Sequence, residues 1–207
     1  MIQVAGLWRT FLMTVSLTGL RKGEAMGLQW GDIDWASGRL HVRRQLQGGE
    51  LTKTKTRAGR RIIPLVPELV SALKRWRLAA PKGPLDLVLP NAAGGMLSDH
   101  TVDRYGLHPA LRRAGLREIT LHWLRHGYGS MLVSQGASPK VVQMIMGHSS
   151  IQMTMDVYGH LMPGDMESAA AVLTRAMARP DVTEACNDFG SSGEKSPEIR
   201  AAAEDVR

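Results

Sequence analysis

The amino-acid sequence predicts an α+β fold that is mostly helical and carries a small three-stranded antiparallel sheet. Apolar residues recur at helical spacing over much of the chain, beginning with residues 7–17. Between residues 39 and 65 the pattern changes to short β-branched or apolar runs that are separated by turn residues. With 207 residues the chain can support one sizeable core, so we expect one compact domain and a tail.

The N-terminal part predicts two helices followed by the sheet. The first helix ends at Thr18 and Gly19, and a short second helix carries residues 24–28. The strands are expected near residues 39–45, 50–54 and 60–65.

The remainder of the core is predicted to be helical, because each segment has a recognisable start or stop. Proline occupies the first turn of a helix over residues 67–78. The other expected boundaries are an N-cap at Ser98 for a helix to Leu111 with a kink at Pro109, N-caps at Thr120 and Ser138, and a stop at Gly147.

Composition divides the chain into a basic domain, residues 1–179, and an acidic tail, residues 180–207. The domain carries 23 Lys or Arg against 12 Asp or Glu, a formal charge of +11, whereas the tail has three against seven, or −4. A basic domain fits a polyanionic partner such as nucleic acid, although a solvated basic surface has the same composition. The tail lacks periodicity and is expected to be disordered or loosely helical.

The single cysteine, Cys186, lies in the tail, so an internal disulfide is impossible and a reducing compartment is indicated. The N-terminal apolar stretch is too short to span a bilayer and contains Arg9. We therefore expect a cytoplasmic, nucleoid-associated protein without a membrane partner.

One segment, TGLRKGE, carries Arg21 and Glu24. The pattern T-G-L-R-x-x-E resembles the turn that bears the first catalytic arginine of the tyrosine recombinases, or phage integrases. A guanidinium presents a planar fork of donors that suits two phosphate oxygens. By itself the pair is also an ordinary ion pair on a helix surface. The resemblance implies that Glu24 orients Arg21 from just outside the site.

The segment from residue 121 to 161 extends the resemblance. His122 and Arg125 form H-x-x-R on one helical face, His148 follows 23 positions after Arg125, and Tyr158 follows ten positions after His148. Each residue alone is commonly structural, but the joint spacing matches the family's catalytic box.

Residues 50–65 resemble the family's hairpin, whose lysine protonates the leaving 5′ oxygen. Lys55 is the expected proton donor and Lys53 the alternative. Lys53, Arg57, Arg60 and Arg61 are expected to contact the DNA backbone.

The resemblance implies transesterification of DNA without metal, cofactor or nucleotide. Tyr158 attacks the scissile phosphate and leaves a 3′-phosphotyrosyl bond. Arg21, Arg125 and His148 stabilise the phosphorane-like transition state, and His122 accepts the tyrosine proton.

The resemblance also implies double-stranded DNA at paired sites as partner, a homotetramer formed through a helix over residues 164–177, and accessory DNA-bending proteins. Full-length integrases carry a core-binding domain before the catalytic one, and only some twenty residues precede Arg21. The chain is therefore expected to be a truncated product, a fragment or a mis-started frame, and a catalytically weak DNA-binding remnant is the main alternative.

Two other kinds of site match parts of this segment. His122 and His126 stand four apart, as helical zinc ligands do, but Trp123 occupies the position where a zinc protease needs glutamate. Residues 125–127, RHG, match the signature of histidine phosphatases, which in that family follows the first strand near the N-terminus. Here the tripeptide lies mid-chain in a helical pattern, so both interpretations rank below the recombinase.

Overall fold

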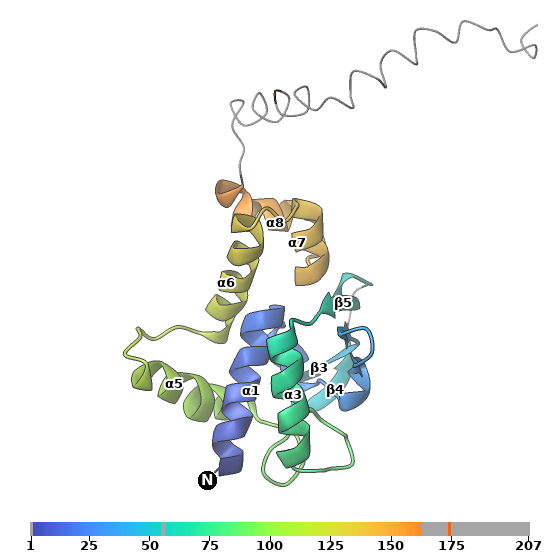
Figure 1. The fold of residues 1–207 in the computed structure, drawn as a ribbon, viewed down its shortest axis with the longest axis vertical. Coiled ribbons are helices and arrows are strands. Elements are labelled where there is room, and N and C mark those ends of the chain that lie inside the picture. Colours follow the sequence, from blue (N-terminus) through green and yellow to red (C-terminus); the bar gives the residue numbers. More distant parts are fainter. Residues whose placement is uncertain (1, 55–56, 163–173, 175–207) are drawn as a thin grey trace, which may run out of the picture. The chain divides into compact units, whose positions relative to one another are not determined.

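A 17-residue helix, α1 (Ile2–Thr18), packs against α3 and α6 (Figure 1). In this computed structural model, residues 2–54, 57–162 and 174 are described. The apolar side chains of α1 that recur at helical spacing are buried: Leu7, Trp8, Phe11 and Val15. The predicted start of the core is therefore confirmed, and the helix begins earlier than residue 7.

The turn after α1 needs glycine at position 19. Gly19 has a φ of +63°, in the left-handed region that side chains with a Cβ adopt at a cost. It leads into α2 (Lys22–Met26), whose first turn is closed by Glu24, which accepts a hydrogen bond from the Arg21 backbone N–H at 2.8 Å. This tight turn fixes the position from which the Arg21 side chain extends.

The three-stranded antiparallel sheet exists, and two of its strands fall within the expected ranges 39–45 and 60–65, but the third is not the one expected. Its order is β1 (Ile33–Asp34), β2 (Arg39–Val42) and β5 (Arg61–Pro64), with Leu40 opposite Ile63. The predicted strand over 39–45 ends at Val42, because the chain turns away at Arg43. A separate hairpin follows, formed by β3 (Arg44–Gln47) and β4 (Glu50–Lys53).

The cause of that break is a contact distant in sequence. Arg44 pairs with the buried Asp32, which Arg43 also approaches at 3.5 Å. Local alternation of apolar residues carries no information about such an ion pair, so it predicted one continuous strand.

Helix α3 (Pro67–Ala79) starts with proline in its first turn, as predicted, and buries Leu69, Leu73 and Trp76. After a long connection come α4 (Asp99–Thr101), a π-helical stretch η3 (Val102–Leu107) and α5 (His108–Arg113). The irregular turn lies just before Pro109, which has no N–H to give to a carbonyl one turn earlier. The expected distortion is thus present as a π-helical segment.

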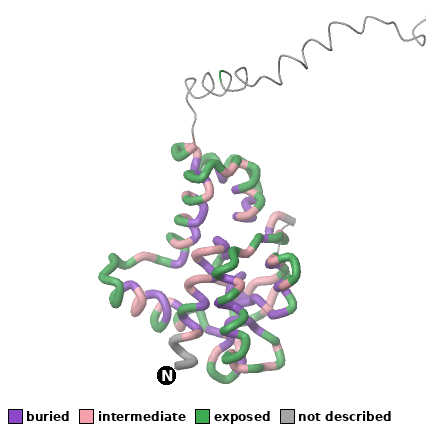
Figure 2. The backbone as a smooth tube through the Cα atoms, in the orientation of Figure 1, coloured by how far each residue is buried: buried purple, intermediate pink, exposed green. Residues whose placement is uncertain are grey.

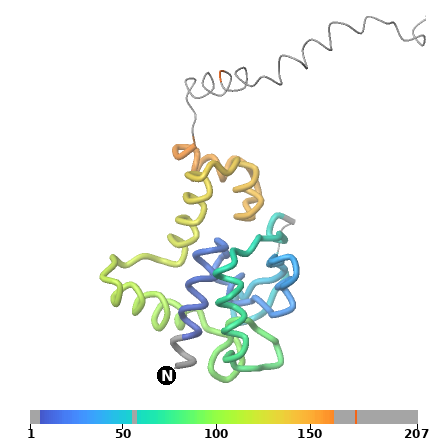
Figure 3. The backbone as a smooth tube through the Cα atoms, viewed as in Figure 1, coloured from blue at the N-terminus to red at the C-terminus, as the bar shows by residue number. Residues whose placement is uncertain are grey.

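Three α-helices follow, α6 (Leu121–Ser134), α7 (Pro139–Met146) and α8 (Ile151–Tyr158), and α8 continues into a 3-10 turn, η4 (Gly159–Leu161). Ser138 caps α7 through its side chain, and Gly147 ends it with a φ of +64°. Helix α8 was not delimited from the sequence, and its N-cap is Ser150. The trace in Figure 3 shows α6 leading from the α1 region to α7 and α8.

The buried apolar residues form two clusters, a main core and a smaller one (Figure 2). The smaller core lies among α6, α7 and α8 and consists of Tyr128, Val133, Val142, Met146 and Tyr158. Tyr158 therefore belongs to a packed cluster. The expected helix over 164–177 and the tail lie outside the described residues, and the boundary at residue 179 stays a prediction.

No helix among the described residues combines the length and the apolar character needed to cross a membrane.

We expect Gly19→Ala to destabilise the fold more than Gly115→Ala. Both glycines have φ near +64°, but a Cβ at Gly19 would lie 2.5 Å from Tyr128 Cδ1, whereas one at Gly115 meets nothing within 4 Å. The control should lose about 1 kcal/mol from backbone strain, and Gly19→Ala at least about 1 kcal/mol more from overpacking. Urea unfolding measures both, and equal losses would contradict the clash.

Candidate active site

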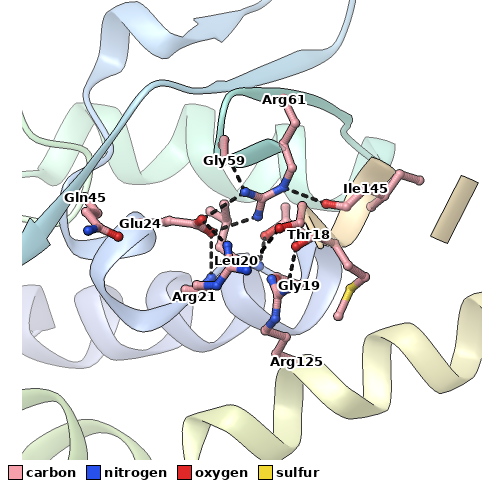
Figure 4. Close-up of polar contacts among 12 residues, drawn as sticks. Thr18, Gly19, Leu20, Arg21, Glu24, Gln45, Gly59, Arg61, Arg125 and Ile145 are labelled. Carbon is pink, nitrogen blue, oxygen red and sulfur yellow. Dashed lines mark hydrogen bonds and ion pairs between the residues drawn. The ribbon is translucent and has the colours of Figure 1, made fainter. Parts of the chain in front are cut away.

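A buried carboxylate, Glu24, receives two guanidinium groups (Figure 4). Arg61 donates from Nη1 and Nη2 to the two Glu24 oxygens at 2.9 and 2.8 Å, and Arg21 donates from Nη1 at 2.9 Å. The Glu24 side chain is 1% exposed. Burial alone would raise the pKa of Glu24, but hydrogen bonds and charge from Arg61, and then from Arg21, outweigh burial and lower it.

Arg61 does not lie where the sequence predicted. Its side chain is only 5% exposed and both of its terminal nitrogens are bonded to Glu24. A DNA backbone contact requires an accessible guanidinium, so the expectation for Arg61 is corrected. Arg61 is a buried counter-ion of Glu24, whereas the Arg21 side chain remains 42% exposed.

Three arginines hold the C-terminal end of α7. Arg61 Nε donates to the carbonyl of Ile145 at 2.7 Å, Arg125 donates to that of Met146, and Arg21 donates to that of Gly147 at 3.1 Å. The last carbonyls of a helix have no partners within the helix and carry partial negative charge. The next residue is His148, so this cap sets the position of His148 relative to the arginines.

Arg125 is buried between two parts of the fold. It donates to the Gly19 carbonyl as well as to that of Met146. Burial, followed by the charges of Arg21 and Arg61, lowers the pKa of Arg125 to about 10. The group is still protonated at neutral pH, but its positive charge is poorly compensated, which favours an anion nearby.

Arg21, His122 and Arg125 line one pocket of about 500 Å³, together with residues of α2, the β3 strand and the start of α6. His122 is exposed there. Two guanidiniums and an imidazole around one pocket match the donors that an anionic phosphate requires.

His148 is buried and its Nδ1 lies 2.9 Å from the Thr154 hydroxyl. Burial, followed by the charges of Arg125, Arg21 and Arg61, lowers the pKa of His148 to about 4, so the ring is neutral at neutral pH. It stacks on Tyr158, with ring centroids 6.4 Å apart and planes 11° apart. The contact brings together two residues that the sequence proposed for one site.

Tyr158 is only 1% exposed, and burial raises the pKa of its hydroxyl. The hydroxyl lies 3.4 Å from Nδ1 of His126. The sequence assigned the tyrosine proton to His122, but the imidazole next to the hydroxyl in the structure is that of His126. The sequence analysis considered His126 only as a zinc ligand or as part of a phosphatase signature, although its position one helical turn after His122 places it beside the box.

A basic hollow of about 570 Å³ lies over the strands. Lys53 and Arg60, both expected to contact DNA, line it and are exposed. His41, Arg43 and Arg44 also line it, and sequence reasoning missed them, although the run HVRR was a visible signal. Lys55 lies outside the described residues, and Arg57 begins the short turn η2 (Arg57–Gly59).

The rings of His122 and His126, which the sequence raised as helical zinc ligands, meet edge to face with centroids 4.3 Å apart. Within the described ranges no three His, Cys, Asp or Glu side chains gather in a way that could hold a metal ion.

The model of the phage integrase family matches residues 7–164, which include all these positions. The chain belongs to the phage integrase family. The predicted resemblance is thus confirmed, and RHG in this phage integrase domain is part of H-x-x-R-H, so the phosphatase interpretation is not supported.

Curated relatives carry the same family identity. The chain is 30% identical over 180 residues to a tyrosine recombinase XerC-like protein of Caldanaerobacter subterraneus subsp. tengcongensis, which covers 75% of this chain and 46% of the relative. It is 31% identical over 181 residues to the ICEBs1 integrase of Bacillus subtilis, covering 79% and 48%. The chain thus spans about half the length of the curated relatives it matches.

The fold is also that of solved integrases. The Tn1549 transposon integrase, in complex with transposon right end DNA, superposes with a TM-score of 0.66 at 26% identity and covers 82% of this chain and 58% of that one. The expected fold class of this phage integrase domain, mostly helical with a small antiparallel sheet, is confirmed.

We expect Arg61→Ala to destabilise the domain by on the order of 3 kcal/mol, because it removes the main partner of a buried carboxylate and a cap on α7. The control is Arg60→Ala, an adjacent exposed cation, which should change stability by less than about 0.5 kcal/mol. Urea unfolding of both variants makes the comparison. Equal stabilities would mean that the Arg61–Glu24 pair contributes nothing.

Proposed function

We propose that this chain carries the catalytic centre of a site-specific DNA recombinase that breaks and rejoins DNA through a 3′-phosphotyrosyl intermediate. The observation that supports it most is the grouping of Arg21, His122 and Arg125 around one pocket, with His148 and Tyr158 stacked beside it. The match to the family over residues 7–164 includes all five of these residues, which supports the proposal.

In this mechanism the scissile phosphate occupies the pocket of Arg21, His122 and Arg125. Arg21 retains exposed surface, and each guanidinium has N–H groups beyond those already bonded to carbonyls. Charge that develops on the equatorial oxygens would be stabilised by donors already held in place, a contribution that typically amounts to a hundredfold or more in rate for each donor.

His148 acts as a neutral donor. Its depressed pKa removes the positive charge, and when the Thr154 hydroxyl donates to Nδ1, the ring proton lies on Nε2. Tyr158 then attacks phosphorus, and Lys55 protonates the leaving 5′ oxygen. The covalent bond conserves the phosphodiester energy, so rejoining to a second 5′ hydroxyl needs no nucleotide.

DNA can reach Tyr158 only after a rearrangement, because the side chain is 1% exposed. Engagement of the pocket would therefore accompany exposure of the Tyr158 hydroxyl, with the neighbouring His126 kept in contact.

Partners and location are proposals for the whole protein. We infer double-stranded DNA at paired sites as substrate, since the Tn1549 relative was solved with transposon DNA. A tetramer assembled through residues 164–177, accessory DNA-bending proteins and action at the nucleoid stay predictions.

A covalent adduct tests the proposal directly. We expect this chain to become attached to a nicked suicide duplex, in which the freed 5′ fragment diffuses away so that even slow cleavage accumulates. Because the target sequence is unknown, the duplex is randomised and the captured DNA is sequenced. The adduct should disappear in Tyr158→Phe and persist in the matched control Tyr105→Phe, whose ring is 55% exposed and outside the site.

Denaturing electrophoresis separates the outcomes. An adduct that survives in Tyr158→Phe would assign the nucleophile elsewhere. Intact DNA binding without any adduct would contradict cleavage and leave the DNA-binding remnant as the better description.

The basic hollow supports a prediction on affinity. Removing Lys53 and Arg60 together should reduce the slope of log K against log salt by about 2, because each phosphate contact contributes about 0.9. The control pair is Lys74→Ala with Arg75→Ala, exposed on α3 and outside the hollow. Fluorescence anisotropy over a salt series measures the slopes, and equal reductions in both pairs would assign the effect to net charge alone.

A further inference from the structure

The Tyr158 ring occupies a slot on α6 that exists because position 129 is glycine. A Cβ built on Gly129 would lie 2.3 Å from the Tyr158 hydroxyl oxygen and 2.4 Å from Cζ. Any larger residue would push the ring out. The slot therefore sets the direction of the hydroxyl as well as burying the ring.

His126 stands three residues before Gly129, on the same face of α6. Its Nδ1 is 3.4 Å from the Tyr158 hydroxyl, and the ring centroids are 6.1 Å apart. A phenol in this geometry donates its proton to an unprotonated ring nitrogen. Burial, followed by the charges of His122 and Arg125, lowers the pKa of His126, which favours the neutral ring. In the tautomer whose proton lies on Nε2, Nδ1 is unprotonated and accepts from the phenol.

The ring beside His126 on α6 is that of His122, and it is exposed to solvent. His122 meets His126 edge to face with centroids 4.3 Å apart, and His122 is exposed in the pocket that Arg21 and Arg125 line. The three side chains thus form a continuous row, from a buried phenol through a partly buried imidazole to an exposed one.

We infer that His126 is the immediate acceptor of the Tyr158 proton. As the bond from the Tyr158 oxygen to phosphorus forms, the phenolic O–H breaks and the proton bonds to Nδ1 of His126. The bond from phosphorus to the 5′ oxygen breaks, and that oxygen takes its proton from Lys55. The step rests on the proposed recombinase function and deepens it.

The groups facing His126 from each neighbouring element define its titration. On α6 these are His122 and Arg125, from α8 it is Tyr158, and from the turn before α8 it is His148, whose own pKa His126 influences. A neutral His126 is needed to accept the proton, so cleavage should slow as pH falls through the pKa of His126.

The test measures the rate of adduct formation by the whole chain on the captured DNA sequence. His126→Leu should slow adduct formation about a hundredfold at unchanged DNA affinity and lose the pH dependence at the acidic side. His126→Asn keeps a hydrogen-bond acceptor near the position of Nδ1 but cannot take a proton, so it should be equally slow. The matched control, His160→Leu, removes an exposed histidine beyond Tyr158 and should react at the original rate.

A substrate with sulfur at the bridging 5′ position separates acceptor from donor. Sulfur leaves without protonation, so it should restore cleavage to Lys55→Ala and leave both His126 variants slow. A rate in His126→Asn equal to the original would overturn the inference in favour of a merely structural histidine. Rescue of the His126 variants by sulfur would also overturn it, because their defect would then concern the leaving group.

Failure of the proposed function gives a different result. If the unsubstituted chain forms no adduct on any DNA, recombinase chemistry itself fails. A measurement on the free protein then still tests the contact: 3-fluorotyrosine replaces the three tyrosines, and the ¹⁹F resonance of Tyr158 should report the titration of His126. A Tyr158 resonance that is identical in His126→Asn would contradict the contact.

Discussion

The site depends on how the C-terminal end of α7 is held. Successive carbonyls of Ile145, Met146 and Gly147 accept hydrogen bonds from Arg61, Arg125 and Arg21, which come from the sheet, from α6 and from the turn before α2. A helix end without partners for its carbonyls is destabilised. Because these guanidiniums supply the partners, His148 is fixed by side chains of which two, Arg21 and Arg125, also line the proposed phosphate pocket.

The arrangement leaves positive charge in excess. Glu24 pairs with Arg61 and Arg21, whereas Arg125, among the described residues, is bonded to carbonyl oxygens of Gly19 and Met146. Burial, and after it the charges of the neighbouring arginines, lowers the pKa values of Arg125 and His148, so part of each shift reflects the same imbalance. An anion in the pocket would relieve it, so the domain is electrostatically prepared for a phosphate and gains little from a neutral ligand.

Much of the site was predictable because its residues belong to short patterns. Arg21 and Glu24 lie in one turn, His122 and Arg125 one helical turn apart, and helix stops such as Gly147 have local causes. The position of Arg61 was not predictable, because its partners Glu24 and Ile145 are 37 and 84 positions away in the sequence. A run of basic residues predicts a DNA-binding surface, and nothing local to it indicates that one of them pairs with a buried carboxylate. The same reason explains the strand broken at Arg43 and the contact of His126 with Tyr158.

Burial of Tyr158, the proposed nucleophile, and its contact with His126, the proposed base, act together. The ordinary pKa values of tyrosine and histidine differ by about 3.5 units, so moving a proton from one to the other is uphill by about 5 kcal/mol. In this site the pKa of Tyr158 is raised and that of His126 lowered, which widens the gap. A stable phenolate therefore does not form beforehand. The proton can leave only as the bond to phosphorus develops, when the falling basicity of the phenolic oxygen makes the transfer favourable, and a neutral imidazole already in contact is the acceptor that such a concerted step requires.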